Sequence, residues 1–303
     1  IEHYIVFPVK KNAALYRLFQ YSFYPAILCF TAASSLLMMV YMHPNDYIFI
    51  PGILMIVIIM ISVVVEHIFP YRQAWLRNKG DVLSDFFQTF VILPTASKIA
   101  EFAIPIVLFY PITWLSSSLG VFKFSQEWGT LTHFMIALLA CEFFYYWYHR
   151  IGHELPLLWR FHSVHHGAER VYWLNSGRFH VLDAFASSFL YFTPMLFLGT
   201  SPEAVILIIT FSSVTGFMEH VNIDFKAGWL NYILNTAEHH RWHHSLKIVE
   251  SNTNYGKVLI VWDLVFRTFH LPKDKAVQEV GIVGNPVSRN FFGQLIHPFK
   301  KGA

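Results

Sequence analysis

Two long apolar segments near the start of the chain limit its possible folds more than any other feature. Residues 21–42 carry no charge, and a second apolar segment, residues 47–65, follows a short polar turn. At about 1.5 Å per helical residue, a run of about 20 apolar residues crosses a hydrocarbon core about 30 Å thick. Charged residues make up only 14% of the chain, whereas a soluble domain has about 25%. These features predict a helical membrane protein.

Four more apolar segments follow along the chain. Residues 86–119 are interrupted by prolines and charges, which indicates one broken crossing or a helix lying partly in the interface. Residues 131–148 form a further helix, and residues 184–198 and 203–221 form a hairpin around Gly199 and Pro202. We expect an all-α membrane bundle of about four to six membrane-embedded helices with a histidine-rich helical cap.

The whole chain, residues 1–303, is interpreted as a single membrane domain. Residues 1–148 are mainly membrane helices and residues 182–221 form the membrane hairpin, while residues 149–181 and 222–303 form a metal-binding cap. The residues before the first apolar segment do not resemble a signal peptide.

Basic residues predict the orientation in the membrane. Lys10, Lys11 and Arg17 precede the first segment, and Arg72, Arg77 and Lys79 follow the second. Two crossings return the chain to its starting side, and an excess of lysine and arginine marks the cytoplasmic side. Continuing the count puts every histidine cluster on that side, so we expect a multi-pass protein with a cytoplasmic cap. The small net charge of +3 gives no reason to expect a nucleic-acid partner.

Histidine is the unusual residue, with 17 copies, of which 12 lie between His133 and His244. Residues three or four apart share a helix face, and neutral imidazole is a common ligand for iron, copper, zinc and nickel. Three clusters with this spacing on one membrane face predict a site for two metal ions, whereas a merely histidine-rich surface predicts scattered histidines. The clusters are His149 and His153; His162, His165 and His166; and His240, His243 and His244.

Only two cysteines, Cys29 and Cys141, are present, and both lie in apolar runs. We therefore expect neither a disulfide nor a thiolate site, which argues against a zinc ribbon or an iron–sulfur cluster. Nitrogen-rich ligation suits iron, while zinc and copper stay open. An all-histidine site beside a membrane favours oxygen chemistry on an apolar substrate.

The clusters and their flanking residues resemble the fatty acid hydroxylase/sterol desaturase superfamily. The resemblance covers residues 142–270, from Glu142 through the first two clusters to the third cluster, with Asn254-Tyr255-Gly256 and Trp262-Asp263 after it. The pattern is most similar to the bacterial sterol-desaturase-like and alkylglycerol monooxygenase groups, and the latter group shares Glu154 directly after the first cluster. The motif is specific for the superfamily but not for the lipid.

This resemblance implies a di-iron enzyme that uses O2 to hydroxylate, desaturate or cleave a lipid. It implies that the eight clustered histidines are ligands of two Fe2+ ions, for which zinc can substitute in purified protein. His220 resembles an isolated histidine that some members use, and His180 occupies another position where members often have one. His239 is a further candidate, either as a ligand or as a hydrogen-bond donor behind one.

Two acidic residues are candidate catalytic groups. Glu142 lies seven residues before His149 on the same helix face, and a charge inside a membrane helix is usually paired or functional. We expect its carboxylate to accept the ring N–H of a ligand histidine, or else to pair with Arg150 or Arg160. Glu154 is a candidate for a similar role or a weak ligand. Unranked further candidates are Asp183, Glu219, Glu238 and Asp263.

The predicted function is oxygen-dependent oxidation of a membrane lipid such as a sterol or fatty acyl chain. Without a flavin or nicotinamide fingerprint, electrons must come from a separate reductase, a small carrier or a pterin. Arg170, Lys247 and Lys257 are candidates for docking an acidic carrier. One alternative is an ether-lipid monooxygenase dependent on tetrahydrobiopterin. Another is a non-catalytic metal-binding membrane protein, although a transporter would place its ligands near the middle of its spans.

Other details of the sequence bear on these interpretations. Residues 143–148 are aromatic and either line a lipid tunnel or form an interfacial belt. Val181 replaces the proline that usually follows the histidine at position 180, and Arg267 replaces a glycine in the family's final motif.

Overall fold

The computed structural model describes residues 12–119 and 127–300 of the chain. Within these ranges the regular structure is helical, apart from isolated β-bridges such as Pro70–Ile223. The all-α prediction is confirmed. The basic residues Lys10 and Lys11, which entered the orientation argument, lie outside the described residues.

The first two membrane helices agree with the predicted apolar segments. Helix α1, Ala13–Tyr41, begins earlier than predicted, because Asn12 caps its first turn by accepting hydrogen bonds from the amides of Ala14 and Leu15. The 3-10 turn Pro44–Phe49 leads into α2, Ile50–Ile68. Both are long and apolar enough to cross a membrane.

The apolar segment of residues 86–119, which was predicted to be a broken crossing or an interfacial helix, belongs to one almost continuous helical segment. Helix α3, Val82–Phe87, passes through a π turn, Gln88–Ile92, into α4, Leu93–Leu119. Pro105 and Pro111 lie inside α4 without ending it. The stretch Val82–Leu108 meets the length and hydropathy of a membrane span.

Four further helices, α5 to α8, follow along the chain. Helix α5, Thr130–Glu154, is followed directly by α6, Pro156–His166, and α7, Val181–Leu198, turns at Gly199 into α8, Pro202–His220. The left-handed backbone of Gly199, with φ 65°, ends α7. Among the described residues, α7 and α8 join α1, α2 and α3–α4 as the five candidate spans, whereas α5 is not one of them.

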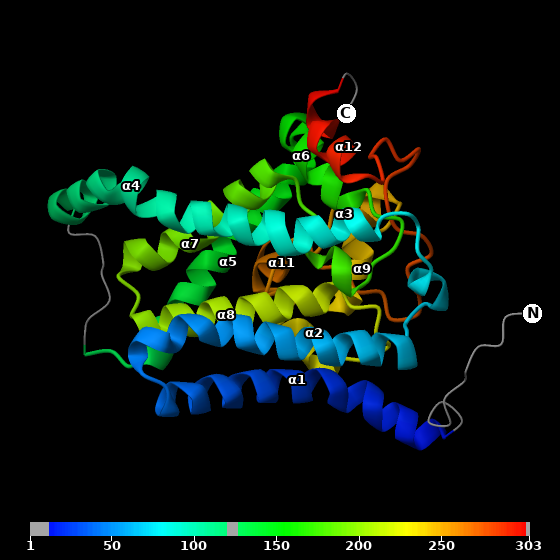
Figure 1. The fold of residues 1–303 in the computed structure, drawn as a ribbon, viewed down its shortest axis with the longest axis horizontal. Coiled ribbons are helices and arrows are strands. Elements are labelled where there is room, and N and C mark those ends of the chain that lie inside the picture. The colour runs from blue at the N-terminus through cyan, green and yellow to red at the C-terminus, as the bar shows by residue number, and fades with distance from the viewer. Residues whose placement is uncertain (1–11, 120–126, 301–303) are drawn as a thin grey trace, which may run out of the picture.

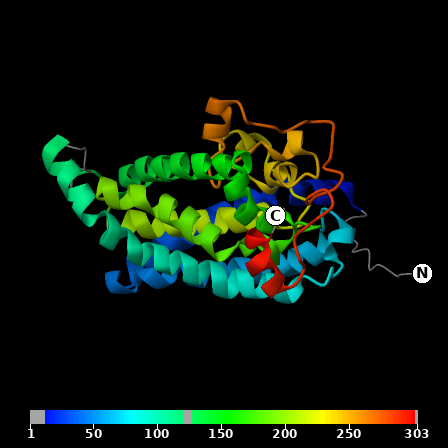
Figure 2. The same cartoon turned by 90° about the horizontal axis from the view of Figure 1, so that it is seen from above.

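The long helices run side by side along the molecule (Figures 1 and 2). Helix α7 packs against α4 and α5, and α8 packs against α1, α2 and α5. In Figure 1, α2 and α8 end, and α7 begins, at the same end of the bundle. Counting the crossings along the sequence likewise placed these helix ends on one side of the membrane.

Shorter helices cover this end of the bundle and form the cap. They are η3 Gln73–Leu76, η5 Trp173–Gly177, η6 Gly228–Tyr232, α9 Ala237–His243, α10 Ile248–Ser251, α11 Val261–Phe266, α12 Phe291–Ile296 and η7 His297–Phe299. Asp224 ties the cap to α1, since its carboxylate accepts hydrogen bonds from Tyr16 and Gln20.

Arg267 ends α11 in a left-handed conformation, with φ 61° and ψ 35°. This backbone explains why the family's motif usually has glycine there. A left-handed residue other than glycine costs about 1–2 kcal/mol, part of which is offset because glycine loses more entropy on folding, about 0.5–1 kcal/mol.

We expect Arg267→Gly to raise the free energy of unfolding by about 0.5–1 kcal/mol, since the left-handed strain outweighs the added entropy of the unfolded chain. Equilibrium unfolding in mixed micelles measures the change. Arg267→Ala is the matched control, because it removes the same exposed side chain but keeps the strain. Equal effects of the two substitutions would contradict this account.

Candidate metal centre

Nine histidines gather into two adjacent groups at the capped end of the bundle. In each group, one side-chain nitrogen per residue lies within 4.8 Å of the corresponding nitrogens of the others. The first histidine group is His149, His153, His162, His166 and His243, and the second histidine group is His165, His220, His240 and His244. All are buried except His153, which is half-buried.

Helical spacing explains how few elements supply so many candidate ligands. His149 and His153 are one turn apart at the end of α5, and α6 divides its histidines between the two groups. Helix α9 divides its histidines in the same way, with His243 in the first group and His240 in the second. His220, the last residue of α8, completes the second group. Both groups therefore take histidines from the same two helices, α6 and α9.

Hydrogen bonds behind the rings set which nitrogen faces inward. The Nδ1 of His149 lies 2.8 Å from the Tyr255 carbonyl oxygen, and the Nδ1 of His243 lies 2.8 Å from the Thr253 carbonyl oxygen. The Nδ1 of His165 lies 3.1 Å from the Arg178 carbonyl oxygen. A carbonyl oxygen only accepts, so each Nδ1 must carry the proton. In a neutral ring, the Nε2 of each then presents a lone pair to the interior of its group.

With both rings neutral, the inward-facing nitrogens lie too close together to be explained without a cation between them. His149 Nε2 is 3.1 Å from His162 Nε2, whose Nδ1 donates to a carboxylate of Asp183 3.0 Å away. Two lone pairs then face each other, and neither nitrogen can donate. A metal ion about 2.1 Å from each of two imidazole nitrogens at right angles separates those nitrogens by about 3.0 Å. The donor set therefore fits a metal ion.

The second histidine group has the same geometry. His244 Nε2 lies 3.1 Å from His165 Nε2 and 3.0 Å from His240 Nε2, and His240 Nε2 lies 2.8 Å from His220 Nε2. His220 directs its Nδ1 at the side-chain oxygen of Asn175, 3.0 Å away. The cluster can hold a metal ion in each group.

Buried carboxylates lie against the outer faces of both groups. Asp183 accepts from His162 and also from the hydroxyl of Tyr148. Glu219 approaches His240 Nδ1 at 3.5 Å, which is an electrostatic contact rather than a good hydrogen bond. Neutral imidazoles alone cannot balance the charge of divalent ions, so with metal bound these carboxylates would supply negative charge beside the rings.

Two predicted candidates lie outside both groups. His180 is the N-cap of α7, where its Nδ1 accepts from the Leu182 amide and its Nε2 faces the Leu295 carbonyl oxygen. His239 lies in the capping box of α9, with Nδ1 3.4 Å from the Thr236 amide. Both rings take part in helix capping.

The expected contact between Glu142 and a ligand histidine is wrong. Its buried carboxylate instead accepts three backbone N–H groups, those of residues 257–259, through one oxygen. Glu154 is exposed and pairs with Arg150 at 2.8 Å rather than with a histidine. Glu238 holds the amide of Ala227 and the side chain of Asn231.

The three basic residues proposed to dock an acidic carrier do not form a surface. Arg170 is buried and pairs with Asp81 at 2.6 Å. The Lys257 amine points inward, 4.4 Å from the centre of the Tyr191 ring. Lys247 is exposed but pairs with Glu250 in its own turn. The docking prediction is wrong because two of the three cations face the interior.

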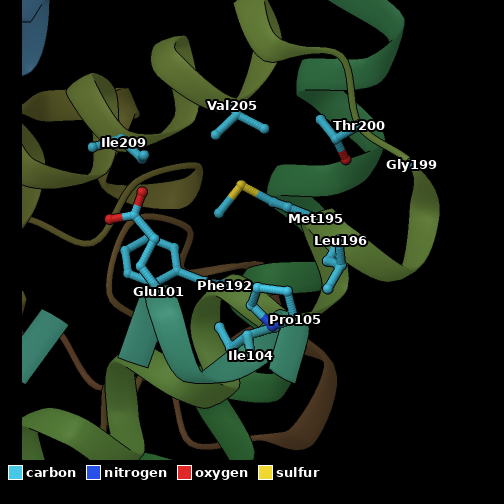
Figure 3. Close-up of a pocket in the computed structure, with 10 residues that line it drawn as sticks. All are labelled: Glu101, Ile104, Pro105, Phe192, Met195, Leu196, Gly199, Thr200, Val205 and Ile209. Carbon is cyan, nitrogen blue, oxygen red and sulfur yellow. The ribbon is translucent and has the colours of Figure 1, made fainter. Parts of the chain in front are cut away.

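The aromatic end of α5 packs mainly against the cap. Phe143 contacts Trp262, Tyr146 and Trp147 contact Phe266, and Tyr145 contacts the ring of His149. A separate pocket of about 250 Å³ lies between α4 and the α7–α8 hairpin (Figure 3). Its lining is apolar apart from Glu101 and Thr200 and contains no histidine.

Burial keeps the cap histidines neutral. Burial, helped by the neighbouring imidazole of His162, lowers the pKa of His149 to about 3. For the same reason the pKa values of His153, His166 and His243 lie well below the usual value of about 6.5. Metal binding needs neutral imidazole, so the site is already in the required protonation state at pH 7.

We expect acid to destabilise the metal-free protein. Histidines of the unfolded chain take up protons near pH 6.5, whereas folded His149 resists protonation until about pH 3 and the pKa values of His153, His166 and His243 are also lowered, so the unfolded state binds more protons below pH 6.5. Stability should be full above pH 6.5 and fall as the pH drops below it. Thermal unfolding of chelator-treated protein across this range tests the prediction, which a flat profile from pH 7.5 to pH 5 would contradict.

Comparison with known proteins places this site in a family. A family model described as Fatty acid hydroxylase matches residues 134–268, the stretch that carries both histidine groups. Ornithine lipid hydroxylase OlsE of Rhizobium tropici is 32% identical over 241 residues, which cover 78% of this chain and 71% of that protein. The chain belongs to the fatty acid hydroxylase family. With five candidate spans among the described residues, this family member is an integral membrane protein.

Other relatives of this fatty acid hydroxylase family member match over a shorter region. Alkylglycerol monooxygenase of Homo sapiens is 35% identical over 154 residues, which cover 51% of this chain and 34% of that protein. The Danio rerio protein of the same name is 35% identical over 150 residues, covering 50% of this chain and 33% of its own. The predicted superfamily is thereby confirmed. No solved structure matches the chain.

Proposed function

We propose that this protein is an O2-dependent di-iron enzyme that hydroxylates a C–H bond of a membrane lipid, or desaturates it. The observation that carries the proposal is the pair of histidine groups whose Nε2 lone pairs face one another. Two bound ferrous ions would supply O2 activation and oxidation of an unactivated C–H bond. The relatives named as lipid hydroxylase and monooxygenases support lipid as the substrate class.

The residues of the chain would hold, orient and shield this centre. The nine histidines of the two groups would be the ligands, and the acceptors behind Nδ1 of His149 and His165 keep these two rings turned inward. Asp183 and Glu219 would balance part of the metal charge. Burial of the rings keeps bulk water from the site. His180 and His239 would have a structural role.

We propose that the capped end faces the cytoplasm. Arg17 at the start of α1 and Arg72, Arg77 and Lys79 after α2 belong to that end, and the cytoplasmic side is the side enriched in arginine and lysine. Electrons would come from a separate reductase, carrier or reduced pterin on that side.

The test joins metal analysis to a lipid-product screen. Detergent-purified protein is reconstituted with Fe2+, supplied with a reductant and 18O2, and given lipid mixtures that include ornithine lipids, sterols and fatty acyl lipids. We expect about two iron ions per chain and one labelled oxygen in a hydroxylated lipid. Fewer than one ion per chain after anaerobic reconstitution would overturn the proposal.

A pterin-dependent ether-lipid monooxygenase is the second candidate function. The alkylglycerol monooxygenases match about half of this chain. Cleavage of an alkylglycerol with reduced tetrahydrobiopterin as the sole electron source would favour this function over the first. A third, non-catalytic metal-binding role would be supported by two bound ions without lipid-dependent O2 uptake.

A further inference from the structure

Two buried carboxylates hold the loop of residues 252–260 by five consecutive backbone amides. Asp263 accepts from the amides of Tyr255 and Gly256, each at 2.8 Å, through different oxygens. Glu142 accepts from the next three amides, those of residues 257–259, at 2.8–3.1 Å. A side chain at Gly256 would meet the Leu259 carbonyl oxygen of the same loop at 2.3 Å and Oδ2 of Asp263 at 3.2 Å, so this turn of the loop has room only for glycine.

This loop supplies the acceptors behind the first histidine group. The carbonyl oxygens of Tyr255 and Thr253 face His149 and His243, each at 2.8 Å, and the Asn252 side chain lies 3.2 Å from His153 Nδ1. Three of the five rings in that group are therefore oriented by one segment.

A different segment, residues 167–180, supplies the acceptors behind two of the four rings of the second group. Its Arg178 carbonyl oxygen faces His165 and its Asn175 side chain faces His220. Two carboxylates at the start of α3 hold this segment. Asp81 pairs with Arg170 at 2.6 Å, while Asp85 pairs with Arg178 at 3.1 Å and accepts from the hydroxyl of Tyr172.

We propose that each histidine group is positioned by its own carboxylate-held loop, so that the two metal sites can be weakened one at a time. Asp263 and Glu142 act on the first group through the loop of residues 252–260. Asp85 and Asp81 act on the second group through residues 167–180. These acidic residues are positioning residues, and the inference rests on the proposed metal centre.

The arrangement predicts opposite results for two chemically matched substitutions. Glu142 receives its three amides on one oxygen, and its other oxygen has no hydrogen-bond partner among the described residues. Glu142→Gln keeps one carbonyl oxygen and should retain both ions. Asp263 uses both oxygens, so Asp263→Asn turns an NH2 group towards a backbone N–H and should release the loop.

The experiment measures metal ions per chain in detergent-purified protein, with Fe2+ and separately Co2+ as the probe, against a graded chelator. Loss of an acceptor behind a ligand lowers metal affinity by about 10–100-fold. We expect Asp263→Asn to retain one ion where the parent protein retains two. Asp85→Asn should also retain one ion, and its Co2+ absorption spectrum should differ from that of Asp263→Asn because the other site is filled.

Thermal unfolding of the metal-free variants separates positioning from folding. If Asp263→Asn does not fold, Glu142→Leu tests the same loop. The inference is overturned if the parent protein binds two ions but the variants of both loops lose both ions equally. It is also overturned if these variants lose no ion. A parent protein that binds fewer than one ion would overturn the proposed function and this inference with it.

Discussion

Replacing His165 by alanine is expected to lower lipid turnover by at least about 10³-fold, equivalent to about 4 kcal/mol of transition-state stabilisation. His165 belongs to the second histidine group, and its Nε2 lies 3.1 Å from His244 Nε2. Its removal takes one of four nitrogens from that group. We expect bound iron to fall from about two ions to about one per chain, as measured by metal analysis beside product formation.

His180→Asn is the matched control for this prediction. His180 lies outside both groups and caps α7, and asparagine is also a good N-cap residue. Iron content and turnover should stay close to those of the parent protein. Retained turnover in His165→Ala, or loss of one ion in His180→Asn, would contradict the assignment of ligands.

Replacing Arg178 by methionine is expected to lower the free energy of unfolding by about 3–5 kcal/mol, because removing one member of a buried ion pair leaves the other charge uncompensated. Arg178 and its partner Asp85 are 1% and 0% exposed. The guanidinium also donates to the Val164 carbonyl oxygen, next to His165 of the second histidine group. Unfolding of the metal-free protein in mixed micelles measures the change without a contribution from bound ions.

Lys247→Met provides the control, since Lys247 belongs to an exposed pair with Glu250 and such pairs add little stability. Adding Asp85→Leu to Arg178→Met should recover part of the loss, because an apolar pair can replace a buried ion pair. A loss no larger than that of Lys247→Met would show that the buried pair is dispensable.

The sequence was sufficient to predict features that depend on neighbours along the chain. Apolar runs long enough to cross a membrane predicted α1, α2 and the α7–α8 hairpin, because each helix satisfies its own backbone hydrogen bonds. Spacing of three and four residues predicted the shared helix faces of His149 and His153 and of the α6 histidines. The glycine replaced by Arg267 marked a turn, and the turn is left-handed.

Only the tertiary structure decided how distant segments use these residues. Sequence spacing could not divide the nine histidines into groups of five and four, because α6 and α9 each contribute to both. Nor could it separate His220, which is a member of the second group, from His180, which caps a helix. Each distinction depends on contacts between residues far apart in the chain.

The same reason explains the errors about charged residues. Glu142 was expected to face a histidine seven positions away, yet its oxygen is satisfied by amides more than 110 positions later. Lys257 and Arg170 were interpreted as surface charges, yet both point inward. The local sequence determined helices, turns and ligand types, whereas long-range packing decided which partner neutralises each buried polar group, since that depends on which groups folding brings within hydrogen-bond distance.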